Sequence, residues 1–90
     1  VIEIRSPEDE TYEKLSFYAA LGTREVIVID RDSKRPEIYR LAGSNLIALQ
    51  QDADGWLRAE TMSVRFRAVE GQPPRLRIED AVDARIHVEI

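Results

Sequence analysis

The sequence contains no cysteine, a single histidine and no long apolar run. Without cysteine there is neither a disulfide framework nor a thiolate metal site. No segment approaches the ~20 apolar residues that a membrane-spanning helix needs, and there is no signal-peptide pattern. These absences exclude a disulfide-rich secreted scaffold, and they predict a cytoplasmic protein that does not bind membranes.

An excess of basic charge is also missing, because 13 lysines and arginines stand against 17 aspartates and glutamates, for a net charge of -4. This balance argues against a dominant electrostatic contact with nucleic acid, which normally needs a basic patch. Two local clusters of basic residues exist all the same. They are Arg31, Lys34, Arg35 and Arg40, and then Arg58, Arg65 and Arg67. A local basic face therefore remains open.

What the sequence does contain is typical of a small globular protein. Its 90 residues are 43% hydrophobic and 33% charged, which predicts one domain with a modest core. Turn-forming residues near positions 50–55 divide this single domain, residues 1–90, into a first part at 1–50 and a β-rich extension at 51–90.

The first strand is expected at residues 1–5. Apolar Ile2 and Ile4 alternate with Glu3 and Arg5, so the two charges share one face of the strand. A carboxylate at a strand end with cations nearby is a plausible site for a metal and a phosphate. The pattern taken alone favours the simpler interpretation, a half-buried edge strand with solvated charges.

A helix is predicted at residues 7–21, with Ser6 as its N-cap, Pro7 at its first position and Gly22 just past its end. This helix carries Lys14. Two interpretations of Lys14 remain open: it is either a solvated residue that pairs with Glu10 one turn earlier, or an ammonium that points inward and meets Glu3 on the strand.

The rest of the chain reads as strands. The near-continuous apolar run at residues 25–30 predicts a strand covered on both faces, parallel to the first and joined to it by a right-handed helical crossover. A hairpin strand at 37–41 follows. Alternating or extended segments then occur at 46–50, 56–59, 64–69, 76–79 and 86–90, which predicts an antiparallel meander. The fold class is therefore α+β.

Three further features invite a functional interpretation. His87 lies on the polar face of the last strand and reads as a surface histidine. Trp56 follows a turn, which favours a core or interface anchor over a stacking platform. Asp52 and Asp54 precede Gly55 as in a calcium loop, but the remaining ligands of an EF-hand do not follow.

Several motifs taken together, in this order and at this spacing, resemble the Uma-two family of restriction endonucleases in the PD-(D/E)xK nuclease superfamily. The motifs are Val1–Pro7, Glu13-Lys14-Leu15 with Tyr18 and Gly22, Glu25–Asp30, and Ile38–Leu41. The resemblance implies that the fold is similar to the C-terminal part of a restriction-endonuclease-like fold.

The resemblance also implies a site. Glu3 would be a magnesium ligand and catalytic residue, and Lys14, supplied by the helix, would be the catalytic lysine. Arg5 occupies the place where most of the superfamily carries that lysine, and it can hold a phosphate bidentately. The implied substrate is DNA.

One departure from the family pattern affects activity. The family places a metal-binding aspartate on a strand upstream of the glutamate, and no such residue precedes Glu3 here. We therefore expect a C-terminal fragment or a shortened relative that is inactive alone, and the start at Val1 favours the fragment. The alternative is a non-catalytic protein-interaction or dimerisation module, a homo-oligomer formed by pairing of exposed strand edges.

Overall fold

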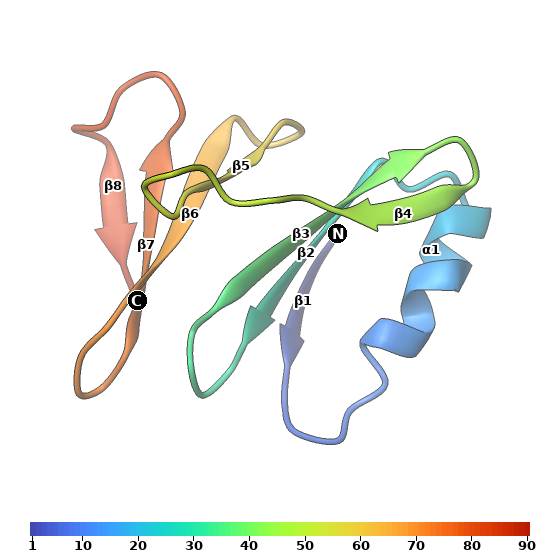
Figure 1. Ribbon diagram of the computed structural model, residues 1–90, viewed down its shortest axis with the longest axis horizontal. Helices are drawn as coiled ribbons and strands as arrows, with labels where there is room; N and C mark the ends of the chain where they lie inside the picture. Colours follow the sequence, from blue (N-terminus) through green and yellow to red (C-terminus); the bar gives the residue numbers. More distant parts are fainter.

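The computed structural model describes all residues from 1 to 90 and has the α+β architecture predicted from the sequence. Two four-stranded sheets lie one against the other, and α1 covers the far side of the first sheet (Figure 1). The elements are β1 (Ile2–Arg5), the 3-10 helix η1 (Tyr12–Lys14), α1 (Leu15–Ala20), β2 (Glu25–Asp30), β3 (Pro36–Ala42), β4 (Asn45–Ala48), β5 (Leu57–Ala59), β6 (Val64–Val69), β7 (Arg75–Asp80) and β8 (His87–Glu89).

The first sheet has the strand order β1-β2-β3-β4. The predicted strand-helix-strand unit is confirmed, because β1 and β2 are adjacent and parallel, with Ile2 opposite Ile27 and Arg5 opposite Asp30. Strand β2 then pairs antiparallel with β3, and β3 with β4. The prediction that β2 is covered on both faces is also confirmed, since its residues from 25 to 29 are all buried.

The second sheet is the predicted antiparallel meander, in the order β5-β6-β7-β8. Its inner face packs on the first sheet, and the core lies between them. Ile27, Ile29 and Ile38 come from the first sheet, and Leu57, Ala59, Phe66 and Leu76 come from the second. Because β-strand side chains alternate, the neighbouring residues of β2 face the opposite side, toward α1.

A buried carboxylate joins the two sheets. Glu25, at the start of β2, is only 3% exposed. It accepts hydrogen bonds from the Arg40 guanidinium at 2.9 Å, the Glu60 N–H at 3.0 Å, and the Thr61 N–H and hydroxyl at 3.1 and 2.6 Å. Burial by itself would raise the pKa of Glu25, but these donors outweigh it and leave the pKa below its usual value.

The predicted helix start is wrong. Residues 7–11 form a loop in which Glu8 has a φ of 66°, and helical structure begins only at Tyr12. Asp9 holds this loop by accepting the N–H of Ser6 at 2.7 Å and of Thr11 at 3.0 Å, so Ser6 is a donor here and not an N-cap. No helix of the structure is long and apolar enough to cross a membrane.

The two faces of β1 are reversed relative to the simpler interpretation of the sequence. Ile2 and Ile4 are 48% and 58% exposed, whereas Glu3 and Arg5 are half-buried on the side of α1. The second sheet packs on β2 and β3, and it leaves Ile2 and Ile4 of β1 largely uncovered. The apolar side chains of this edge strand are therefore exposed. Its charged side chains, Glu3 and Arg5, lie between the sheet and the helical segment.

Candidate functional site

The structure brings Glu3 and Lys14 together. Glu3 lies in the middle of β1, opposite Val28, and its side chain is 19% exposed. Lys14 ends η1, and its Nζ lies 3.5 Å from Glu3 Oε1, with about half of the lysine side chain exposed. The predicted contact of Lys14 with Glu3 is therefore confirmed, although the lysine remains at the surface and does not point into the interior.

Tyr18 completes this contact, and sequence reasoning missed it. Its hydroxyl donates a hydrogen bond to the same Glu3 Oε1 atom, and this bond raises the pKa of Tyr18. Lys14 and Tyr18 lie four residues apart on consecutive helical turns, and this spacing was the available signal for their shared target. Because both groups contact Oε1, Glu3 Oε2 keeps its lone pairs for another ligand.

Arg5 lies beside this pair but is already engaged. Its Nη1 group donates to Asp30 Oδ2 at 2.9 Å, and its guanidinium lies 5.0 Å from the centre of the Tyr12 ring. Asp30 also accepts the N–H groups of Ser33 and Asp32, and these bonds lower its pKa together with the charge of Arg5. Arg5 therefore retains its Nε and Nη2 donors for another partner.

A third carboxylate lies on the same face but belongs to a separate cluster. Glu37 of β3 is opposite Val28, and it accepts hydrogen bonds from Tyr12 at 2.6 Å and from Tyr39 at 3.4 Å. Burial and the bond to Glu37 raise the pKa of Tyr12 to about 12. Both phenols bind Glu37 Oε1, so Glu37 Oε2, like Glu3 Oε2, accepts no hydrogen bond.

The carboxylates of this layer do not form a complete metal site by themselves. No group of three His, Cys, Asp or Glu side chains in the structure lies close enough together to hold a metal ion. Both oxygens of Asp30 already accept hydrogen bonds, whereas Glu3 Oε2 accepts none and is the unpartnered oxygen of the carboxylate that Lys14 contacts. Magnesium requires octahedral oxygen coordination, and the carboxylate in contact with Lys14 offers one free oxygen, Glu3 Oε2.

The other sequence candidates lie elsewhere. His87 is exposed on β8, in the second sheet, with Nδ1 3.0 Å from the Ala84 carbonyl oxygen. Asp52 accepts the N–H groups of Asp54 and Trp56 and so closes a turn. Trp56 is 8% exposed, which confirms that it is an anchor and not an open stacking platform.

Comparison of the chain with known proteins tests the family resemblance suggested by its sequence motifs. No curated protein and no solved structure matches the chain. One family profile does match, and it covers residues 1–79. The match includes β1, η1, α1 and β2, which carry Glu3, Lys14 and Tyr18, and it extends well past the motifs that suggested the resemblance. The chain therefore belongs to the Uma2 family of putative restriction endonucleases.

Proposed function

We propose that Glu3 and Lys14 are part of a magnesium-dependent nuclease site that acts on the phosphodiester bonds of DNA, in the cytoplasm. The observation that carries this proposal is the 3.5 Å contact between Lys14 Nζ and Glu3 Oε1, with Tyr18 on the same oxygen. The family is described as putative restriction endonucleases, and an acid with a lysine from the following helix matches the roles that such a site needs.

Each residue has a defined role in this proposal. Glu3 offers Oε2 as one metal ligand, and Tyr18 fixes the carboxylate by binding Oε1. Lys14 places positive charge where the phosphate gains negative charge. Arg5 contacts phosphate oxygens through Nε and Nη2 while Asp30 holds Nη1. Magnesium, when bound, polarises the phosphodiester and lowers the pKa of the attacking water.

The proposal predicts a weak Mn²⁺ site on β1. In ¹H–¹⁵N spectra, Mn²⁺ added at sub-stoichiometric concentration should selectively broaden the amide signals around Glu3, because Oε2 is a free hard ligand. This broadening should disappear in Glu3→Gln. It should persist in Glu10→Gln, which removes an exposed acid close by in the sequence. Broadening spread evenly over all exposed carboxylates would contradict the proposal.

The same samples give a control on activity. Because a single carboxylate does not hold Mg²⁺ firmly against water, the chain alone should leave supercoiled plasmid intact in Mg²⁺ or Mn²⁺. We propose that a second carboxylate, from outside these 90 residues, completes the active enzyme. Nicking that disappears in Glu3→Gln would show that an acid of this chain already completes the site.

A second candidate function is assembly without catalysis, and the exposed edge of β1 favours it. Strand β1 has a neighbour on one side only, and Val1, Ile2 and Ile4 are each about half exposed. An edge strand with apolar side chains is a template for pairing with another strand. In this second proposal, two copies of the chain pair through β1 and form a homodimer.

Sedimentation equilibrium tests this second candidate. The chain should have twice the mass of one copy at micromolar concentration, and Ile4→Lys should shift it to the monomer because the ammonium opposes close strand pairing. Ile47→Lys is the matched control, since Ile47 is 52% exposed on β4 at the opposite edge of the same sheet. A monomeric wild-type chain, or equal effects of the two substitutions, would exclude the dimer.

A further inference from the structure

The outer face of the second sheet gathers an unusual share of the basic charge. Its strands alternate, so the residues next to the core positions Phe66 and Leu76 point away from the first sheet. Five of these outward residues are arginines: Arg58, Arg65, Arg67, Arg75 and Arg77. We call this set the arginine face. It holds five of the 13 basic residues of a chain whose net charge is -4.

The strand register places like charges directly opposite each other. Arg58 lies opposite Arg65, and Arg67 lies opposite Arg77. Like charges at opposed positions of an antiparallel pair destabilise a sheet. The fold therefore carries a local repulsion on this face, and a bound anion would relieve it.

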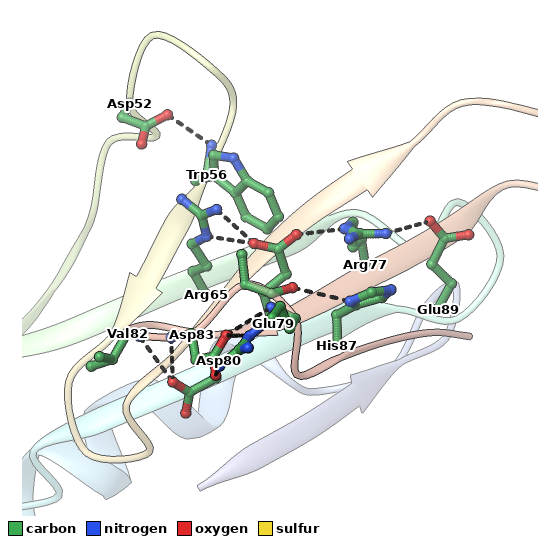
Figure 2. Close-up of polar contacts among 12 residues, drawn as sticks. Asp52, Trp56, Arg65, Arg77, Glu79, Asp80, Val82, Asp83, His87 and Glu89 are labelled. Carbon is green, nitrogen blue, oxygen red and sulfur yellow. Dashed lines mark hydrogen bonds and ion pairs between the residues drawn. The ribbon is translucent and has the colours of Figure 1, made fainter.

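Internal acids neutralise only part of this charge. Glu79, which is 5% exposed, lies 2.6 Å from both Arg65 Nη2 and Arg77 Nε, and Arg77 also pairs with Glu89 at 3.3 Å. Figure 2 shows this chain of contacts running across β6, β7 and β8. Arg58, Arg67 and Arg75 form no salt bridge, so on the strands themselves five arginines face two paired acids. Asp52 and Glu60 lie at the edge of this face, beside Arg58 and Arg65, and reduce the positive charge there.

Trp56 fixes the arginines and indicates the kind of ligand. The guanidinium carbons of Arg65 and Arg67 lie 3.9 and 4.5 Å from the centre of its ring, so cation–π attraction holds both groups over Trp56. With Trp56 buried, the arginine face offers no open aromatic ring on which an unpaired base can stack. The chemistry suits phosphate groups and not the bases of a single strand.

We propose that the arginine face binds the phosphate backbone of duplex DNA without sequence preference. Arginine forms bidentate, charge-assisted hydrogen bonds with phosphate oxygens, and released counterions add to the affinity. The choice of DNA over an acidic protein rests on the proposed function. The second sheet and α1 lie on opposite sides of the first sheet (Figure 1), and Glu3 contacts Lys14 and Tyr18 on the helix side. The arginine face therefore contacts a different stretch of DNA from the one at Glu3.

The test is fluorescence anisotropy with a labelled duplex of about 20 base pairs, in EDTA, over a range of salt concentrations. The triple variant Arg58→Ala, Arg67→Ala, Arg75→Ala removes the three arginines without a carboxylate partner. It should weaken binding at least tenfold at low salt and reduce the slope of log K against log salt by about 2 to 3. The matched control is Arg24→Ala, Arg31→Ala, Arg35→Ala, which makes the same change in net charge at exposed positions outside the face.

The control variant should keep most of the wild-type affinity and salt slope. Equal losses in the two variants, or no loss in either, would overturn the proposal. Stronger binding of the single strand than of the duplex would overturn it as well, and so would competition by polyglutamate at the same charge concentration. Because EDTA removes the metal, failure of the Mn²⁺ experiment at Glu3 leaves this result unaffected, and the two proposals can fail separately.

Discussion

Replacing Glu25 with alanine is expected to lower the free energy of unfolding by about 3 kcal/mol, the range found when one partner of a buried ion pair is removed. The Glu25 side chain is 1% exposed, and its loss leaves the Arg40 guanidinium, two backbone N–H groups and the Thr61 hydroxyl without their acceptor. Urea denaturation followed by Trp56 fluorescence measures the change, and wild-type and variant should have the same m-value.

Glu60→Ala is the matched control for this prediction. Glu60 also pairs with Arg40, at 3.4 Å, but its side chain is 69% exposed, so its removal should cost less than about 1 kcal/mol. The pH dependence provides an internal check. Because folding lowers the pKa of Glu25, its contribution is fully present above the unfolded-state pKa and is lost as the pH falls through the folded-state pKa. A deficit in Glu25→Ala that persists undiminished in acid would contradict this account.

Replacing Phe66 with alanine should cost about 3 to 5 kcal/mol, because it removes a large side chain from the centre of a packed core. Phe66 is 2% exposed and packs between the two sheets with Ile27, Leu57 and Leu76. A 90-residue domain has little stability to spare, so we expect the variant to be largely unfolded at 37 °C. Circular dichroism during thermal melting gives the measurement.

The chain has one other phenylalanine, and it provides the control. Phe17 on α1 is 60% exposed, so Phe17→Ala should change stability by about 0.5 kcal/mol or less. If the two substitutions had similar effects, the core would not lie between the sheets.

Local patterns in the sequence predicted much of this fold. The apolar run at residues 26–29 identified the buried strand, alternation identified β6 and β7, and the crossover rule gave the parallel pairing of β1 with β2. The helix start was not predictable in this way. Ser6 and Pro7 have the residue types of a helix N-terminus, but Asp9 captures two backbone N–H groups and holds a loop there instead.

The contacts that sequence reasoning missed are those that depend on packing between distant segments. The sequence pattern alone places Glu25 at the solvated end of an apolar strand. Its hydrogen-bond partner Thr61 lies 36 residues further along the chain, so no local pattern indicates this contact. The exposure of Ile2 and Ile4 depends on how far the second sheet extends over the first. In contrast, the Glu3–Lys14 contact was predictable. The helix follows the strand closely and packs back on it, so the long Lys14 side chain can reach the carboxylate of Glu3.

Glu3 lies on the edge strand of its sheet, with β2 as its only neighbouring strand. Such a strand opens locally at a lower free energy than one that is paired on both sides. A segment that adds to the outer edge of β1 therefore also holds Glu3 and Lys14 in their contact. Thermodynamic linkage makes this effect reciprocal, so a cation or phosphate that fixes the Glu3–Lys14 contact strengthens strand addition by the same factor. Assembly at the edge and ligand binding at Glu3 then share one coupling free energy.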